Sequence, residues 1–584
     1  MAKKYKESEL QNLPSCAAEY IKLVIKKMRY RKKVRLDVQA ELAAHFEDEL
    51  RDCTTDEEKE QRAQRLIEDF GNAKLLAVLL RRAKKRCRPL WRTIVARTFQ
   101  TIGVLILCFI VYCVYISLGK PTISVNYVEE ATRLTRPVAD ESLNAAPIYQ
   151  KAIDAYKEQP WVKDKTGIGG TFFLLDTEKD KDRGAGEINL LDAIREKKWV
   201  TELTEEELVL LKQWLSDNTD AIEFFKQASE RPYCWWKREA EDNIMLGISM
   251  SELSPLRKIA GMMVWQAKLK AYDGHIKEAF DDLLVCYRAG RHLKGPRFLI
   301  EQLVGIAIHA LSTQSILVIL DNQHVDTRLL KDLQTRLEEI IDEDTYTINC
   351  EAERFFVLDF IQRCYTNNGR GTGYMIPDRV QEFMGRINGA KVSVQSNDEA
   401  EEALKFGEFL AISIASANRR QVMREVEKFY DSFEKYATKT PWQSHKENVD
   451  FEMGLGSWSS LKQARYWPVS MLTPTFGVGS KAGYCWKAQV DAVITTLAVI
   501  RFKQSTGNCP ENLEGLVVAG YLKKVPSDPF SDKPLVYKKT DGNFILYSVG
   551  LDFKDDGGKV YRDEKGKVRL WGDEGDTVFW PVQK

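Results

Sequence analysis

Two short acidic runs near the C-terminus carry the clearest metal-binding chemistry in the sequence. Asp552, Asp555 and Asp556 precede a Gly-Gly pair, and Asp573 and Asp576 recur in WGDEGDTVFWP. Hard cations such as Ca²⁺ take several oxygen ligands at about 2.3–2.6 Å, and carboxylates this close in sequence repel one another unless solvent or a cation screens them. We therefore name these five aspartates as candidate calcium ligands. The spacing is not that of an EF-hand, and two solvated acidic turns are the alternative interpretation.

Catalytic chemistry has less support. The sequence contains neither H-E-x-x-H nor G-x-S-x-G. The carboxylate clusters at 239–242 and 338–342 could supply a glycosidase-like acid and base, and Tyr233, Trp235 and Trp236 beside the first could stack on sugar rings. On polar helix faces such clusters are more often solvated surface. We predict no enzyme, and an extracytoplasmic hydrolase acting on a polysaccharide or peptide is the alternative.

The elements that must position these residues are organised around one apolar stretch. Residues 98–118, TFQTIGVLILCFIVYCVYISL, contain 21 residues and no charge. A helix of this length crosses the roughly 30 Å hydrocarbon core of a bilayer with every backbone group bonded internally. Core helices of soluble proteins seldom stay apolar on every face over this length, so we predict one transmembrane helix that acts as an uncleaved signal-anchor.

The flanking charges predict the orientation of this helix. Eight basic residues and no acidic residue lie between residues 81 and 97: Arg81, Arg82, Lys84, Lys85, Arg86, Arg88, Arg92 and Arg97. The other flank has Lys120 and then Glu129 and Glu130. Because cytoplasmic flanks carry the excess of Lys and Arg, residues 1–97 are predicted to be cytoplasmic and residues 119–584 extracytoplasmic.

Composition agrees with a folded, anchored protein. Of the 584 residues, 44% are hydrophobic and 29% are charged, which excludes wholesale disorder. The net charge of +1 divides into +9 over residues 1–97 and −8 over the remainder. A basic inner face suits anionic lipid headgroups, so the membrane is a predicted partner and nucleic acid is not. The sequence predicts no oligomeric state.

The cysteines allow two interpretations. Six of the 11 follow the apolar stretch: Cys234, Cys286, Cys350, Cys364, Cys485 and Cys509. They could form up to three disulfides in an oxidising compartment, or they could be buried free thiols. No pair has the C-x-x-C spacing of a zinc ribbon or a thioredoxin-type site.

Residues 1–97 show helical periodicity that predicts a small bundle. Apolar stripes mark helices at 17–28 and 38–50, a capping box at Thr55 and Glu58 opens a third helix, and a fourth runs into the basic segment. The segments RLDVQAELAAHFEDEL and RLIEDFGNAKLLAVLL contain E-L-x-x-H, ending at His45, and F-G-N, starting at Phe70. They resemble the helical permease-prefix or HAAS-type domains found before membrane spans in bacteria. The resemblance implies a regulatory or protein-contact module.

Beyond the apolar stretch, residues 119–143 are predicted to be an extended tether and residues 144–480 a helical array. The clearest helix pair is capped at Ser254 and turns at Asp273-Gly274, and further amphipathic helices are expected at 297–320, 326–343, 346–364 and 400–438. The turn region, with Tyr272 and Ala279, resembles a single tetratricopeptide helix-turn-helix. Helical arrays commonly bind proteins along a concave face, so we predict protein partners through the array and the bundle.

Residues 481–584 change in composition and predict an α+β domain. A helix from Trp486 to Phe502 precedes β-rich runs, LVYKK and NFILYSV, on either side of a Thr-Asp-Gly hairpin turn. The motif order resembles the globular part of type II secretion major pseudopilins. The residues that carry it are G-x-x-P at 507–510, L-x-x-L-V at 513–517, G-Y-L at 520–522, P-x-D-P-F at 526–530 and Y-S-x-G at 547–550.

The pseudopilin resemblance implies a helix packed on a small antiparallel sheet and a calcium site in a C-terminal loop. Pseudopilins join this domain directly to a hydrophobic N-terminal helix, whereas here it follows the apolar stretch by nearly 370 residues. We therefore expect a reused end domain rather than an assembling subunit.

The predicted fold class is multidomain and mainly α: a cytoplasmic bundle (1–97), a transmembrane helix (98–118), a tether (119–143), an extracytoplasmic helical array (144–480) and a pseudopilin-like α+β domain (481–584). The predicted function is that of a single-pass interaction or scaffold protein of the bacterial inner membrane, associated with secretion or the cell envelope. Calcium is its only predicted cofactor.

Overall fold

The computed structural model describes residues 10–86, 90–163, 187–240, 242–341, 347–387, 399–449, 458–473, 476–564 and 566–583. The protein is mainly helical, as predicted, and has a small three-stranded sheet near the C-terminus. It forms two compact units, residues 1–114 and 115–584, which are described separately.

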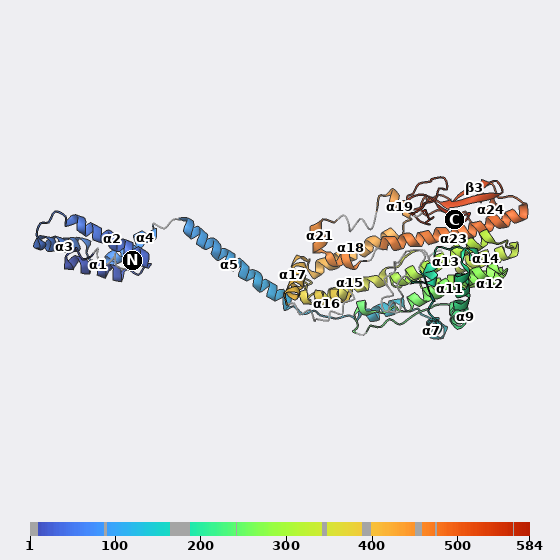
Figure 1. The fold of residues 1–584 in the computed structure, drawn as a ribbon, viewed down its shortest axis with the longest axis horizontal. Coiled ribbons are helices and arrows are strands. Elements are labelled where there is room, and N and C mark those ends of the chain that lie inside the picture. The colour runs from blue at the N-terminus through green and yellow to red at the C-terminus, as the bar shows by residue number, and fades with distance from the viewer. Residues whose placement is uncertain are drawn as a thin grey trace. The chain divides into compact units, whose positions relative to one another are not determined.

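The smaller unit contains a helical bundle and most of one long helix (Figure 1). Its helices are α1 (Ser15–Lys27), α2 (Lys32–Glu49), α3 (Asp56–Phe70), α4 (Ala73–Arg86) and α5 (Leu90–Ser117), whose last turn belongs to the larger unit. The predicted stripes meet in the bundle core, where Ile21, Val24 and Phe46 are fully buried. The predicted capping box is confirmed, because the Glu58 amide donates to the Thr55 hydroxyl at 3.4 Å and the Thr55 amide donates to the Glu58 carboxylate at 3.3 Å.

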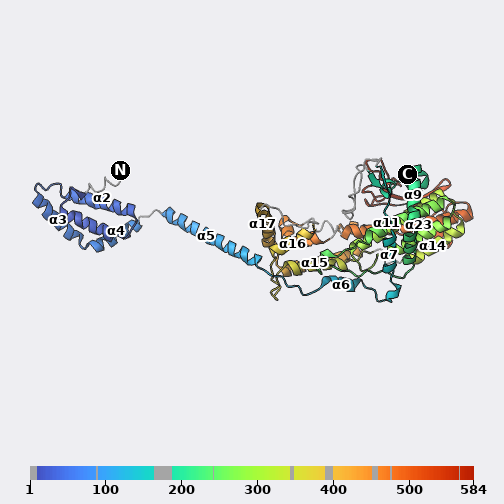
Figure 2. The same cartoon turned by 60° about the horizontal axis from the view of Figure 1, so that its bottom comes forward.

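The larger unit places its helices around α13 (Leu299–Asn322) (Figures 1 and 2). The other helices of five or more residues are α6 (Tyr127–Thr135), α7 (Ala146–Ala155), α9 (Glu205–Asp217), α10 (Thr219–Ser229), α11 (Leu253–Tyr272), α12 (Ile276–Arg291), α14 (Thr327–Ile340), α15 (Glu351–Cys364), α16 (Pro377–Ile387), α17 (Glu399–Ala415), α18 (Arg419–Ala437), α19 (Pro441–Lys446), α21 (Ser460–Arg465), α22 (Trp467–Leu472), α23 (Phe476–Thr506) and α24 (Leu513–Val518). A short helix, α8 (Leu190–Ala193), follows the two-stranded pair β1 (Trp161–Lys163) and β2 (Glu187–Asn189).

Two helices in the described chain are long and apolar enough to cross a membrane: residues 94–117 within α5, and α13. Their surroundings differ. In the apolar 18-residue windows, 6% of the residues are buried in α5 and 67% in α13. The amphipathic stripe expected for α13 is wrong, because α11, α12 and α23 pack around it and leave little of it to solvent.

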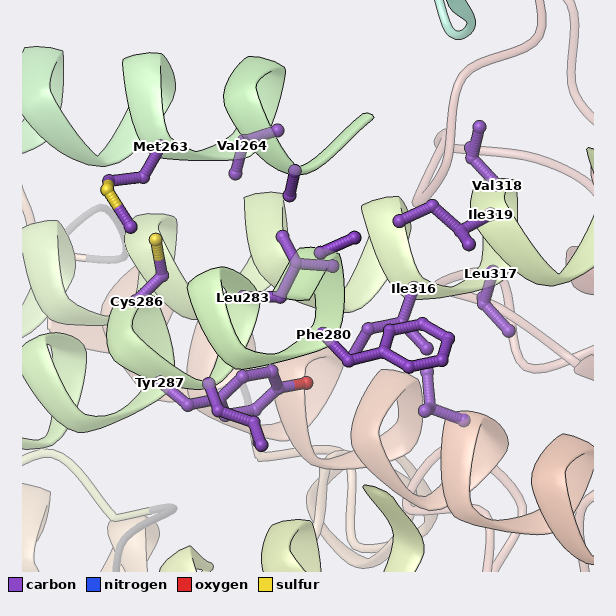
Figure 3. Close-up of a cluster of buried hydrophobic side chains, with 14 of the residues drawn as sticks. Met263, Val264, Phe280, Leu283, Cys286, Tyr287, Ile316, Leu317, Val318 and Ile319 are labelled. Carbon is purple, nitrogen blue, oxygen red and sulfur yellow. The ribbon is translucent and has the colours of Figure 1, made fainter. Parts of the chain in front are cut away.

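The α11–α12 hairpin is the clearest predicted pair, and it forms as expected. Gly274 adopts φ +89° at its turn, a conformation that glycine adopts without strain. Side chains of α11, α12 and α13 interlock in the core around Leu283, Tyr287 and Ile316 (Figure 3). The predicted cap at Ser254 is wrong, because α11 begins at Leu253 and Glu252 is its first flanking residue.

Residues 119–143, predicted to be an extended tether, contain a helix and pack on the larger unit. Val128 and Ala131 of α6 are buried, and α6 lies along α15 (Figure 2). The Gln362 side chain of α15 donates to the Val125 carbonyl at 2.7 Å and accepts from the Val125 amide at 3.2 Å. The tether is therefore fastened to the array along much of its length.

The C-terminal module is an antiparallel sheet in the order β3 (Val536–Thr540), β4 (Asn543–Ser548), β5 (Thr577–Trp580), covered by α23. The predicted hairpin is confirmed, with Thr540 paired to Asn543. β5 comes from the apolar end of the second acidic run and was not predicted as a strand. The expected domain boundary at 480/481 falls inside α23, where Gly479 approaches Leu299 of α13, and array and module share one hydrophobic core.

Buried charges close the N-terminus of α13. Arg238 lies 2.6 Å from both Glu252 and Glu301, and these side chains are almost fully buried. Glu353 of α15 accepts from the Leu299 amide at 2.6 Å, so a neighbouring helix satisfies one of the first backbone donors of α13. Burial raises the pKa of Glu353 to about 7, although the bond to the Leu299 amide opposes that rise.

We expect Glu353 to make stability depend on pH near neutrality. Its folded pKa is raised above the unfolded value, so its contribution is fully present below about pH 4.5 and is lost as pH rises through about 7. Between pH 5 and pH 8 the free energy of unfolding should fall by at most about 3 kcal/mol on this account. Glu353→Gln, measured by denaturant unfolding, should reduce this fall, and the exposed control Glu339→Gln should not. An unchanged pH dependence in Glu353→Gln contradicts the assignment.

Candidate functional site

One buried carboxylate joins two motifs of the C-terminal module. Asp528 of P-x-D-P-F accepts from the Ser548 hydroxyl at 2.8 Å and from the Val549 amide at 3.0 Å, both in Y-S-x-G. It also accepts from the Phe530 amide at 3.1 Å. Burial raises the pKa of Asp528, and these hydrogen bonds oppose the rise. The sequence displays both motifs, but the bond that fastens the end of β4 to the preceding loop is visible only in the fold.

The same P-x-D-P-F motif supports both acidic loops through Phe530. The fully buried Phe530 ring lies 6.3 Å from Phe553 and 5.1 Å from Trp571, measured between ring centroids. Phe553 and Trp571 adopt φ values of 62° and 61°, which are strained for bulky residues and cost about 1–3 kcal/mol each. His445 of α19 stacks on Phe553 at 4.1 Å. Aromatic packing therefore holds these two backbone positions in place.

The five predicted calcium ligands lie on these two loops, and the fold gives most of them backbone partners. Asp576 accepts from the Asp556 amide at 3.3 Å and the Gly558 amide at 2.6 Å. Asp552 accepts from the Gly575 amide at 3.2 Å. These bonds tie the loop after β4 to the loop before β5.

The remaining predicted ligands are more exposed. Asp555 accepts from the Tyr547 hydroxyl at 2.8 Å, which lowers the pKa of Asp555. The Asp556 and Asp573 side chains lie at exposed positions. Burial raises the pKa of Asp576, and the charges of Asp555 and Asp556 raise it further. The structure thus brings Asp555, Asp556 and Asp576 near one another, with the mutual repulsion that their spacing indicates.

The carboxylates of Asp552, Asp555 and Asp576 accept hydrogen bonds that hold the loops together, so they are not arranged as free ligands for a metal ion. Across the described ranges, no group of three or more His, Cys, Asp or Glu side chains is arranged to hold a metal ion. Calcium binding by these loops therefore stays a prediction.

In the two carboxylate clusters named for the hydrolase alternative, three described carboxylates pair with basic side chains instead of facing one another. Glu239 lies 2.6 Å from Lys237, Asp242 pairs with Arg386, and Glu338 lies 2.7 Å from Lys523. Glu241 and Asp342 lie outside the described residues. Two hollows in the described part of the larger unit are lined by His309 and by His292, and neither has a carboxylate in its wall.

The aromatic residues beside the first cluster are used in packing. Trp236 stacks on Tyr149 at 6.1 Å, and the Trp235 indole donates to the Thr135 hydroxyl at 3.2 Å. Tyr233 donates to the Asp140 carbonyl at 2.7 Å. These contacts fasten residues 233–236 to the α6–α7 segment, and they do not present the rings as a sugar-binding platform.

The cysteines beyond the apolar stretch are free thiols, which is the second of the two interpretations. Cys234, Cys286, Cys350, Cys364 and Cys509 are buried, and Cys485 is half-buried. Burial raises the pKa of Cys234 and Cys286, which disfavours the reactive thiolate.

Comparison with known proteins finds no matching family model, no matching curated protein and no matching solved structure. The function is therefore proposed from the sequence and the geometry of this chain.

We expect Asp528→Asn to destabilise the C-terminal module. An amide in place of the carboxylate directs N–H donors at a site that already receives the Val549 and Phe530 amides, so at least one buried donor loses its acceptor. The cost should be about 1–3 kcal/mol in the free energy of unfolding, measured in denaturant. The control is Asp541→Asn at the exposed hairpin turn, which should stay within about 0.5 kcal/mol of the parent. Equal stabilities of the two variants would contradict this role of Asp528.

Calcium, if it binds the folded loops alone, should raise the melting temperature of the full chain. The expected stabilisation is about 2.7 kcal/mol at one hundred times Kd. Thermal melts in millimolar calcium and in chelator test this, with magnesium as the comparison ion. Asp556→Asn removes an exposed candidate ligand and should abolish the shift. Superimposable curves for the parent chain would remove calcium from the account.

Proposed function

We propose that this chain is a single-pass interaction protein of a bacterial inner membrane, with residues 1–97 cytoplasmic and residues 119–584 extracytoplasmic. The contrast between α5 and α13 carries the proposal. Both are long and apolar, but protein encloses α13, whereas Phe99, Leu105 and Leu107 of α5 are 73%, 63% and 61% exposed. A continuous apolar surface of this kind is costly in water and is relieved by lipid.

The orientation rests on the basic segment, residues 81–97, that precedes the apolar stretch of α5. Seven of the eight basic residues between 81 and 97 lie in α4 or α5, and Arg88 lies outside the described residues. The C-terminal end of α5 is followed by Lys120 alone before the first acidic residues in α6. This asymmetry favours a cytoplasmic bundle.

The interaction role is supported by an apolar surface on the bundle. Ala73 and Ala77 of α4 are buried, whereas Leu75, Val78 and Leu79 on its other face are exposed. A helix that is apolar on two faces indicates a second partner for the outer face. The resemblance to permease-prefix domains favours a protein as this partner, and the pseudopilin-like end module suggests a link with secretion or the cell envelope.

Topology is the test of the anchor. Protease added to cells with an opened outer envelope should digest the chain beyond residue 119 and spare residues 1–97. Alkaline carbonate should leave the protein in the membrane fraction. Protection of the C-terminal module from protease, or release by carbonate, would contradict the proposal.

The interaction role is tested separately by crosslinking in intact cells. A partner that binds the outer face of α4 should be lost from Leu75→Ser/Leu79→Ser and retained by Gln61→Ser, an exposed change on α3. Identical adducts from the two variants would contradict a partner surface on α4.

A further inference from the structure

The larger unit begins at Tyr115, within the last turn of α5, and residues of this turn pack against the rest of the unit. Ile116 is only 1% exposed, and the Tyr115 ring lies 4.9 Å from the Tyr374 ring. The Tyr374 hydroxyl donates to the Tyr115 carbonyl at 3.1 Å. That carbonyl is among the last four of the helix, which have no partner within it. The end of α5 is therefore closed by a side chain from a distant part of the sequence.

A short hairpin, residues 366–374, supplies this contact. Its ends are joined by the Thr366 amide, which donates to the Tyr374 carbonyl at 2.9 Å, and Pro121 forms an isolated bridge with Thr366. A Cβ atom on Gly119 would lie 2.9 Å from the Thr366 side chain and 3.0 Å from the Tyr374 ring. Glycine at 119 thus permits the chain leaving α5 to lie against the hairpin.

The hairpin and the segment that leaves α5 carry basic residues and no acidic ones. Arg370 is exposed on the hairpin, and the Arg420 amide at the start of α18 donates to the Gly371 carbonyl at 2.9 Å. Lys120 is also exposed, and neither 366–374 nor 117–127 contains an Asp or Glu. Tertiary structure therefore gathers basic residues from three separate segments beside the end of α5.

We call the exposed surface formed by Tyr115, Leu118, Lys120, Arg370, Tyr374 and Arg420 the exit patch. It combines three kinds of side chain. Leu118 is apolar and 74% exposed, the two tyrosines are in contact, and the three basic residues are exposed or adjoin the hairpin. This combination matches the boundary of a bilayer, where hydrocarbon, aromatic rings and phosphate succeed one another.

The depth of the exit patch relative to the bilayer follows from where the apolar stretch of α5 ends. The apolar stretch ends at Leu118, so a spanning α5 places Tyr115 and its neighbour Tyr374 where hydrocarbon gives way to headgroups. The hairpin between Thr366 and Tyr374 is then held beside the headgroups. Arginine guanidinium groups bind phosphate oxygens in a bidentate manner, which suits Arg370 and Arg420 to this environment.

We propose that the exit patch binds phospholipid headgroups of the outer leaflet, so that the larger unit lies directly on the membrane that anchors it. This inference rests on the proposed membrane crossing by α5. It differs from the sequence-based prediction, in which residues 119–143 were an extended tether.

Photo-crosslinking of the full chain in nanodiscs tests the inference. Benzoylphenylalanine is placed at Arg370 or, as the control, at Val518, which is 91% exposed in the C-terminal module. The discs contain phosphatidylglycerol and phosphatidylcholine. Irradiation should attach phospholipid at position 370 and not at position 518, as read by mass spectrometry of the peptides. No lipid adduct at position 370, or an adduct to a second copy of the chain in its place, overturns the inference.

A charge change tests the electrostatic part. With the probe at position 370, Arg420→Glu should lower the lipid adduct severalfold, because one basic residue near an anionic surface changes binding about fivefold. The matched control is Arg328→Glu, an equal charge change at an exposed site on α14. An unchanged yield in Arg420→Glu, or an equal fall in Arg328→Glu, overturns binding by the exit patch.

Retention of the chain by the discs in alkaline carbonate is measured on the same samples and reports on α5 alone. Release of the chain contradicts the proposed anchor. A chain that is retained but gives no lipid adduct at position 370 contradicts only the exit patch.

Discussion

A long apolar helix must be enclosed along its whole length, and the larger unit is arranged to do this for α13. The two helices that precede it in the chain, α11 and α12, and the distant helix α23 supply the enclosure. Two buried polar side chains of α13 find acceptors within it: His309 donates through Nε2 to the Tyr287 carbonyl at 2.7 Å, and the Ser312 hydroxyl donates to the Leu283 carbonyl at 2.7 Å. Burial lowers the pKa of His309, so the ring stays neutral in this core. An unsatisfied polar group here would cost about 1–3 kcal/mol.

The enclosure of α13 also explains why the C-terminal module is not a separate body. α23 packs against α13, with Trp486 stacked on His309 at 4.6 Å, and the same helix packs against β4 and β5. Movement of the sheet away from the array would expose part of the shared core. The motifs that distinguish the module, joined through Asp528 and Phe530, therefore shape loops on a rigid support.

The same physical constraint, applied to α5, underlies the functional proposal. Its apolar side chains lack a protein enclosure, and lipid supplies one in the proposed topology. In that proposal, the larger unit contacts the bilayer through the exit patch, and the bundle offers the outer face of α4 to a partner. In this proposal, lipid covers α5 and the apolar part of the exit patch, and a partner covers the outer face of α4. None of these contacts requires a catalytic pocket.

The sequence alone determined the local elements, because capping and turn chemistry act over a few residues. The Thr55–Glu58 box, the Gly274 turn and the β3–β4 hairpin form where their residue types predict. The uncharged stretch in α5 was recognised from its residues, but the segment that forms α13 was expected to be amphipathic, because its sequence does not show that protein encloses it. Tertiary structure decided that enclosure, the fastening of residues 119–143, and the meeting of Tyr115 with Tyr374. It also gave the acidic loops backbone partners for Asp552 and Asp576. These outcomes depend on which distant side chains fill the space around a residue, and local sequence patterns do not encode that.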